Sequence, residues 1–447
     1  MQSNTSRFGL RGFLIDAPQF GSLRQWPNGA LVVENGRISD IGNYDDVRRL
    51  HAPNSIQWIN RGPVAIFPGL VDCHTHLPQY SVVARGESEL LPWLRQHIFP
   101  VEREFTGPKA REEAPQFFRQ LARNGTTTVM AYAAIYEDSC DVGFEAARQT
   151  GIRTILGMMM MDLGSYGQIQ PKKILSISLL ESERLCRKWH KTENGLLDYA
   201  FSPRFAVTCS EKLMRGAAEL ANRFGAYLQT HLAENREELE KVHHLHMGSR
   251  DYTNVYEKCG VLTPRTVLGH CIHLNPREIA AIAAFQSTVA HCPTSNLFLG
   301  SGLIKLDQLL KAGINVGLGS DVAGGPELNM WRVMRAAIEV QKARMAYEPN
   351  LRPLRPSEAF YLGTQGGARA LGKSPIIGTL EPGKEADLIV IDIASLLPYP
   401  QSRNAMAGLT AEDILALCIY RAGPDANLET YVRGKCIYQA PNVPNLA

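Results

Sequence analysis

The sequence predicts an α/β protein, a (β/α)8 barrel of the TIM type with a small β-sandwich domain built from both chain ends. Three observations support this fold. Short apolar runs alternate with amphipathic helical stretches through the middle of the 447-residue chain, which is typical of βαβ units and a parallel sheet. Both ends carry short strands separated by turn residues. No tandem repeat indicates a solenoid or propeller.

The composition excludes several classes of protein. Hydrophobic residues make up 45% of the chain and charged residues 20%, so a large core is possible and disorder is not expected. The net charge of +3 argues against nucleic acid or an anionic membrane as a partner. We find neither a signal-peptide pattern nor a membrane-spanning run. The nine cysteines form no CxxC motif, so we expect a reduced, cytoplasmic protein.

The N-terminal segment reads as short strands at 12–15, 30–34 and 38–42. Asn35-Gly36 joins the last two, and this dipeptide favours a primed hairpin turn. Strand and turn character returns after Ser374, at 378–392, 428–433 and 435–438. We therefore expect three parts: 1–67 and 375–447 as halves of the β-sandwich domain, and 68–374 as the catalytic barrel.

Between these ends lie eight apolar runs, the number of strands that closes a (β/α)8 barrel. They lack clean alternation, as expected for strands buried on both faces. The eight runs are 70–74, 127–132, 154–160, 198–201, 226–230, 266–269, 287–290 and 315–319. The clearest amphipathic stretches between them are 211–224, 236–246, 276–285 and 304–312.

Polar residues follow the predicted strands where a barrel of this type places its chemistry, at the carboxyl ends. The polar residues are His74, His76, Arg204, His231, His270, His291 and Asp321, and Phe205 directly follows Arg204. His74 and His76 stand two apart, so both point to the same side of their strand. Imidazoles with a carboxylate form a mixed shell that suits Zn²⁺ or Fe²⁺. A lone histidine at a strand end would more often be a buried core residue, but the whole set favours a metal.

Two further patterns refine this site. Glu234 follows His231 by three residues, where its carboxylate is placed either to move protons or to complement a helix dipole. No lysine follows any predicted strand, which disfavours two metals bridged by a modified lysine and favours one divalent ion. By contrast, we assign His243, His244 and His246 to a solvated helix face and 158–161 to core packing.

The sequence resembles the metal-dependent amidohydrolase superfamily. The motif PGLVDCHTH at 68–76 carries the resemblance together with His231, His270, Asp321 and GTLEPGKEAD at 378–387. Within the superfamily it is most similar to the guanine deaminases. The stretches behind this closer likeness are HLPQY at 76–80, WLRQHIFPVE at 93–102, PRFAVTCS at 203–210, HLAEN at 231–235, HCPTSN at 291–296 and GSDVAGG at 319–325.

The resemblance implies an activity, hydrolytic deamination of guanine, and a role for each site residue. It implies a homodimer and one metal, usually zinc, held by four ligands: His74, His76, His231 and Asp321. It makes Glu234, His270 and Asp321 the catalytic residues that handle water and protons. It makes Gln79, Arg204 and Phe205 the residues that bind a small purine.

Other functions stay open from the sequence. The substrate can be another heteroaromatic ring, such as a pterin, 8-oxoguanine or an s-triazine. A non-catalytic scaffold on the same fold is a further alternative, disfavoured because every candidate ligand and acid–base residue is present.

Overall fold

The computed structural model describes residues 7–52, 55–86, 89–164, 171–399, 408–441 and 443. The chain divides into two compact units. One comprises Met1–Val71, Arg119–Thr128 and Asn329–Ala447, and the other comprises Asp72–Phe118 and Val129–Leu328. The domain boundaries at 67/68 and 374/375 stay a prediction.

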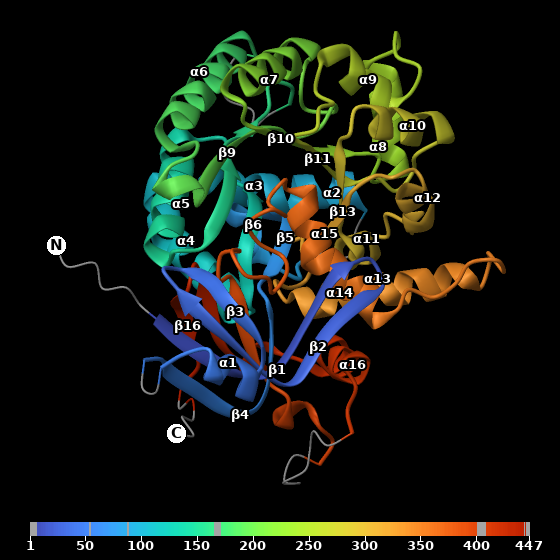
Figure 1. Ribbon diagram of the computed structural model, residues 1–447. Helices are drawn as coiled ribbons and strands as arrows, with labels where there is room; N and C mark the ends of the chain where they lie inside the picture. The colour runs from blue at the N-terminus through green and yellow to red at the C-terminus, as the bar shows by residue number, and fades with distance from the viewer. Residues whose placement is uncertain are drawn as a thin grey trace. The chain divides into compact units, whose positions relative to one another are not determined.

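A parallel sheet in the order β13-β12-β11-β10-β9-β7-β6-β5 forms the predicted barrel (Figure 1). Its strands are β5 (Leu70–His76), β6 (Thr126–Tyr132), β7 (Arg153–Gly157), β9 (Leu197–Pro203), β10 (Tyr227–Leu232), β11 (Thr266–His270), β12 (Thr288–His291) and β13 (Val316–Leu318), and the short β8 (Met159–Met160) pairs with β9. Every residue of these strands is buried, which explains the absent alternation. All eight predicted strands are confirmed. Just past β13, the Asp321 N–H donates to the His74 carbonyl at 2.8 Å, so the first and last strands meet.

Helices lie outside these strands, coloured from teal through green to gold in Figure 1. They are α4 (Gly107–Arg123), α5 (Glu137–Thr150), α6 (Pro171–Trp189), α7 (Glu211–Phe224), α8 (Arg236–Leu245), α9 (Tyr252–Cys259), α10 (Pro276–Ala284), α11 (Pro293–Phe298) and α12 (Leu306–Lys311). Local sequence sets their ends. The Ser210 side chain accepts from the Leu213 N–H to begin α7, and Gly225 ends it in the left-handed region with φ 61°.

Short helices between β5 and α4 carry side chains toward the strand ends. They are η1 (Leu77–Val82), α2 (Leu90–Trp93), η2 (Leu94–Ile98) and α3 (Phe99–Glu104). Of these, η2 is a π-helix, a form that occurs mostly as single turns and often at functional sites.

The chain ends build a seven-stranded sheet in the order β16-β15-β14-β4-β1-β2-β3. Its elements are β1 (Arg7–Gln19), β2 (Ser22–Glu34), β3 (Arg37–Asn43), β4 (Gln57–Pro68), β14 (Leu388–Asp392), β15 (Asn427–Val432) and β16 (Lys435–Gln439), with α1 (Tyr44–Arg49) after β3. Asn35 and Gly36 both have positive φ, 52° and 79°, as a primed turn requires. The strands predicted at both ends are confirmed, whereas β4 was not anticipated.

The sheet has a core of its own. Alternate residues of β2 separate onto its two faces, Leu31 and Val33 in one apolar cluster and Ala30 and Val32 in another, as a period of two dictates. The same unit holds α13 (Met330–Met345), α14 (Pro356–Gly363), α15 (Gln365–Ala370) and α16 (Ala411–Arg421), which the sequence patterns did not single out.

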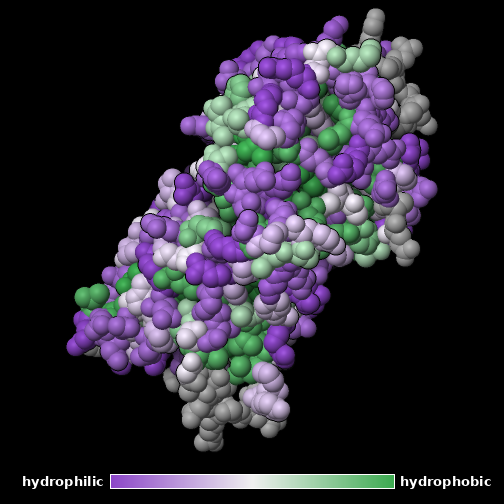
Figure 2. All heavy atoms as spheres, turned by 90° about the vertical axis from the view of Figure 1, so that its right-hand side faces the viewer, coloured by the Kyte–Doolittle hydropathy of each residue, from purple (hydrophilic) through white to green (hydrophobic). Residues whose placement is uncertain are grey.

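The face in Figure 2 is mainly hydrophilic, and its hydrophobic atoms occur in small patches. Among the most exposed large apolar side chains are Leu50, Met247 and Tyr347, which follow three different helices, α1, α8 and α13 (Met330–Met345). Among the described residues, no helix combines the length and the apolar character needed to cross a membrane.

Candidate functional site

Four predicted ligands converge at the carboxyl ends of the barrel strands. The ligand atoms of His74, His76, His231 and Asp321 all lie within 4.8 Å of one another, and all four side chains are buried. His74 Nε2 and His76 Nε2 each lie 3.2 Å from Asp321 Oδ1. His231 Nε2 lies 3.2 Å from His76 Nε2. Residues up to 247 positions apart in the chain thus share one small space.

Backbone conformation brings these side chains together. His74 and His76 lie on β5 and point to one side because strand side chains alternate. Asp321 has φ 48° and His270 has φ 68°, a left-handed conformation that non-glycine residues rarely adopt and that concentrates at functional sites. The chain therefore turns sharply at the end of β11 and after β13, at two of the places where a polar side chain faces the site.

The donor set fits a divalent metal. The His231 Nδ1 faces the Arg204 carbonyl at 2.7 Å; a carbonyl only accepts, so Nδ1 carries the proton and Nε2 presents a lone pair. That lone pair faces another imidazole nitrogen at His76, an arrangement that a shared cation stabilises. Burial lowers the pKa of His74 to about 4 and that of His231 well below its usual range. Both are therefore neutral, the form that binds metals.

Asp321 supplies the negative charge of this set. Burial alone would raise its pKa, but its contacts with His74 and His76 hold the pKa well below the usual range for aspartate. Three imidazoles and one ionised carboxylate form a common shell for zinc or iron.

Glu234 and His270 lie beside the ligands. Glu234 Oε2 is 3.3 Å from His270 Nε2, which is 3.7 Å from Asp321 Oδ2. The Ser301 hydroxyl donates to Glu234 Oε1 at 3.1 Å, and His270 Nδ1 contacts Asn296 Oδ1 at 2.9 Å. Burial raises the pKa of Glu234 to about 7. Burial opposes charge on His270, but the carboxylates of Glu234 and Asp321 outweigh it and raise the pKa of this imidazole.

The position of Glu234 bears on its two sequence-based interpretations. Asn235 is the N-cap of α8, so Glu234 precedes the helix, and its side chain turns toward His270. Its backbone N–H donates to Glu238 Oε2 at 2.9 Å, as does the Asn235 N–H at 3.1 Å. The capping box thus fixes Glu234 while leaving its carboxylate beside the ligands.

The predicted substrate residues face the same cavity. Gln79 lies on η1, and Arg204 and Phe205 follow β9 directly. The full lining is His76, Gln79, Leu90, Trp93, Leu94, Arg204, Phe205, His231, Glu234, His270, Leu299 and Asp321. The structure therefore brings together candidate ligands, acid–base groups and polar binding groups in a cavity with apolar walls, as is usual for small-molecule sites.

Residues 65–421 of the chain match the Amidohydrolase family. The chain belongs to the amidohydrolase family. The resemblance found in the sequence is thereby confirmed. Guanine deaminase of Escherichia coli (strain K12) is 34% identical over 433 residues, which cover 95% of each chain. Guanine deaminase of Homo sapiens is 35% identical over 372 residues, which cover 82% of each.

Solved structures superpose on this amidohydrolase over nearly the whole length of its chain. The structure of E. coli guanine deaminase superposes with a TM-score of 0.89 at 33% identity, covering 97% of this chain and 99% of the other. A guanine deaminase from C. acetobutylicum with bound guanine in the active site has a TM-score of 0.88 at 29% identity, covering 97% and 100%.

Sequence reasoning missed three contributors to the site of this amidohydrolase. Asn296 and Ser301 contact the acid–base pair; Asn296 stands in the motif at 291–296, but no sequence signal assigns it a partner. Glu102 is fully buried and contacts both Gln79 and Arg204. Glu102 ends the stretch at 93–102, which also holds Arg95, Gln96 and His97, so its residue type alone does not mark it.

A second group of potential ligands, His270, Cys292 and Asp321, overlaps the first through Asp321. Burial and neighbouring carboxylates raise the pKa of the Cys292 thiol well above its usual range, so the thiolate that would bind a metal is disfavoured.

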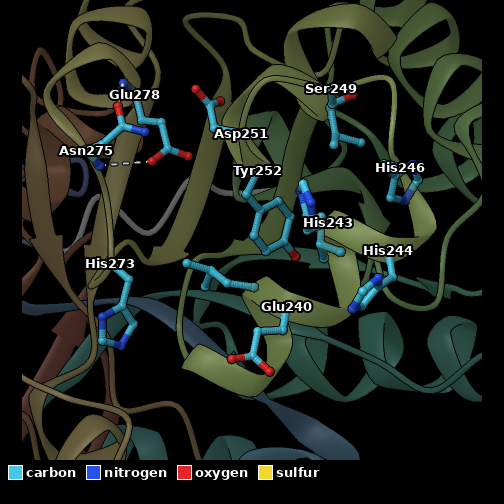
Figure 3. Close-up of a pocket in the computed structure, with 13 residues that line it drawn as sticks. Glu240, His243, His244, His246, Ser249, Asp251, Tyr252, His273, Asn275 and Glu278 are labelled. Atoms are coloured by element: carbon cyan, nitrogen blue, oxygen red, sulfur yellow. Dashed lines mark hydrogen bonds between the residues drawn. The ribbon is translucent and has the colours of Figure 1, made fainter.

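The histidines of α8 lie apart from these groups, around a cavity of about 420 Å³ (Figure 3). His243 and His244 are exposed, which agrees with the solvated face that we expected. His246 departs from it, because it is buried and its Nε2 contacts the Ala206 carbonyl at 3.0 Å. No group of three potential ligands forms there among the described residues.

Proposed function

We propose that the chain hydrolyses guanine to xanthine and ammonia, with His74, His76, His231 and Asp321 holding one divalent metal, zinc or Fe²⁺. The observation that carries the proposal is the convergence of this ligand set with Glu234 and His270 at one cavity. The relatives named guanine deaminase, which match nearly the full chain, support guanine as the substrate.

The metal supplies one thing when bound: it lowers the pKa of a water molecule to about 7, so that a nucleophile forms at neutral pH. Asp321 accepts the proton that this water releases. The pKa of Asp321 is low because of its histidine partners, so the carboxylate is ionised and available. His270 hydrogen-bonds the attacking oxygen and orients it toward the ring.

Glu234 moves the protons on the ring. It donates a proton to N3 of guanine, so that C2 accepts the oxygen. Asp321 then returns its proton to the amine, the C2–N bond breaks, and ammonia leaves. Glu234 takes the proton of the new C2–OH, which becomes the carbonyl of xanthine, so both carboxyl groups return to their starting states. A pKa of about 7 lets Glu234 hold or release a proton at neutral pH, the condition that general acid–base catalysis requires.

Gln79 and Arg204 recognise the O6/N1–H edge of the purine, and Phe205 packs on its face. Arg204 offers only donors, which suit the carbonyl oxygen, whereas a carboxamide has donors and acceptors. One N–H of Gln79 is used by Glu102, and its oxygen accepts from the Ala323 N–H at 3.1 Å. A second N–H and a second lone pair of Gln79 remain to face the ring.

Ammonia release from a panel of substrates tests this proposal. Metal-loaded protein should deaminate guanine with a higher kcat/KM than pterins, 8-oxoguanine or amino-s-triazines. If a pterin were preferred over guanine, the proposed substrate would change. The proposed roles of Gln79 and Arg204 would remain, because pterin shares the 2-amino-4-oxo edge. If the protein bound stoichiometric metal but deaminated no member of the panel, it would be a binding protein and not an enzyme.

The family resemblance also leads us to propose a homodimer. From the cysteine pattern and the small net charge we propose a cytoplasmic protein that acts on small molecules and on neither nucleic acid nor membranes. Size-exclusion chromatography with light scattering tests the oligomeric state.

A further inference from the structure

We propose that Glu102 is a positioning residue that fixes the orientation of the two edge readers, Gln79 and Arg204, and thereby selects a neutral oxo-purine. The inference rests on the proposed function and deepens it. Glu102 ends the stretch at 93–102, a motif that neither the ligand set nor the acid–base pair explains.

The geometry is a carboxylate shared by two side chains. Gln79 Nε2 donates to Glu102 Oε1 at 2.8 Å, and Arg204 Nη1 donates to Glu102 Oε2 at 2.5 Å. All three residues are buried, with 0%, 2% and 3% exposure for Glu102, Gln79 and Arg204. Gln79 and Arg204 line the cavity of the ligand set, and Glu102 stands behind them.

Glu102 orients the Gln79 carboxamide. An ionised carboxylate only accepts hydrogen bonds, so it turns the amide nitrogen of Gln79 toward itself. The Ala323 N–H only donates, and it turns the amide oxygen the other way. With both ends matched, a flipped amide would set oxygen against oxygen and N–H against N–H. The direction in which Gln79 presents its remaining donor and acceptor to a ligand is therefore fixed.

Glu102 also balances the charge of Arg204. A buried cation needs a buried counter-charge, since an unpaired one is costly. The Phe99 ring, 5.1 Å from the guanidinium carbon, adds a cation–π contact and limits where the group can lie. A paired guanidinium donates to a neutral carbonyl without attracting an anion strongly. The pocket is thus suited to O6 of a neutral purine more than to a ring that carries a carboxylate.

Binding of two non-reactive purines tests the role of Glu102. Hypoxanthine keeps the O6/N1–H edge and lacks the 2-amine, whereas purine lacks the edge altogether. In Glu102→Gln, an amide N–H faces the donors of Arg204. The Kd of hypoxanthine should therefore rise about tenfold or more, whereas the Kd of purine should change little. For guanine, KM should rise more than kcat falls. Metal content and Tm of the folded variant are measured alongside.

Glu104→Gln is the matched control. Glu104 lies two residues later on the same helix and is exposed, so this variant should bind both purines as the wild type does. If Glu102→Gln does not fold, Glu102→Asp decides, because withdrawing the carboxylate by one methylene lengthens both contacts and should still reduce the preference for hypoxanthine.

The outcomes separate the two proposals. An unchanged hypoxanthine-to-purine preference in the folded Glu102 variant overturns the positioning role, even if guanine is the substrate. A wild-type protein that binds both purines equally overturns it as well. A wild-type protein that prefers hypoxanthine but releases no ammonia from guanine overturns the proposed function and leaves the role of Glu102 in ligand selection intact.

Discussion

Histidines gather in two regions of the molecule, and among the described residues only those at the strand ends form a candidate ligand set. At the strand ends, His74, His76 and His231 come from two distant strands and meet around Asp321 within 4.8 Å. On α8, His243 and His244 are neighbours in the sequence, yet their ring centroids lie 6.0 Å apart and their side chains are exposed (Figure 3).

The difference comes from the geometry of the two elements. Adjacent residues on a helix do not face each other, so a run of histidines spreads around the axis. The carboxyl ends of parallel strands instead meet at one face of a barrel, and residues far apart in the sequence converge there. Burial completes the contrast: it lowers the pKa of His74 to about 4, which keeps the imidazole neutral for a metal.

Removing a strand-end histidine should have the largest effect. His74→Ala takes away one of four ligands, so we expect less than about 0.1 metal equivalents and a loss of guanine turnover of about 10³-fold or more, because a metal contributes several kcal/mol to such a reaction. Elemental analysis and ammonia release measure both.

Wild-type protein should hold one metal per chain. His243→Ala, treated in the same way, is the control and should retain metal and activity. Two reproducible equivalents in the wild-type barrel site would contradict the single-metal assignment.

Changing Glu234 should separate proton transfer from metal binding. Glu234→Gln keeps the shape of the side chain but cannot accept and return a proton, so kcat should fall on the order of 10²- to 10⁴-fold with metal content unchanged. Steady-state kinetics with parallel metal analysis measures this effect. Near-normal turnover would show that the residue only shapes the entry to α8.

The strand ends were predictable because strong signals coincide there. Eight buried runs give the barrel, and His74, His76, His231 and Asp321 each follow such a run. Glu102 was not predictable, because its role depends on a contact with Arg204, 102 residues away in the sequence, and on the path of the irregular segment before α4. A local pattern does not specify such a pairing.

Two further details, one at a helix end and one in the sheet of the chain ends, also escaped prediction. His246 belongs to the predicted solvated face but leaves the helix: it is the C-cap of α8 with φ −125°, and its side chain is buried. The strand β4 went unnoticed because its first half is only partly buried, which weakens its apolar pattern.

Truncating Arg204 should give an intermediate effect, confined to substrate recognition. Arg204→Ala removes the donor to O6 and leaves Glu102 without its cation, so kcat/KM for guanine should fall about 10- to 100-fold, in line with about 1–3 kcal/mol for each polar group left unpaired. Metal content should stay at one equivalent.

Adenine is the complementary substrate test, because its 6-amino group sets donors against Arg204 and it carries no amine at position 2. It should react very poorly with the wild type. Adenine turned over as fast as guanine, or guanine kinetics unchanged in Arg204→Ala, would refute the edge-reading role.

The smallest effect should come from the other histidine region. In His243→Ala/His244→Ala, two exposed side chains of α8 are lost without opening a core, so we expect a change in unfolding free energy within about 0.5 kcal/mol and kcat/KM within about twofold of the wild type. Chemical denaturation and guanine kinetics measure both. Their neighbour His246 sharpens the test, because its Nε2 contacts the carbonyl of Ala206, which follows the proposed substrate residues Arg204 and Phe205. His246→Ala should therefore destabilise the protein by about 1–2 kcal/mol, although it binds no metal. If the double variant lost metal instead, the contrast between strand-end and helix histidines would fail.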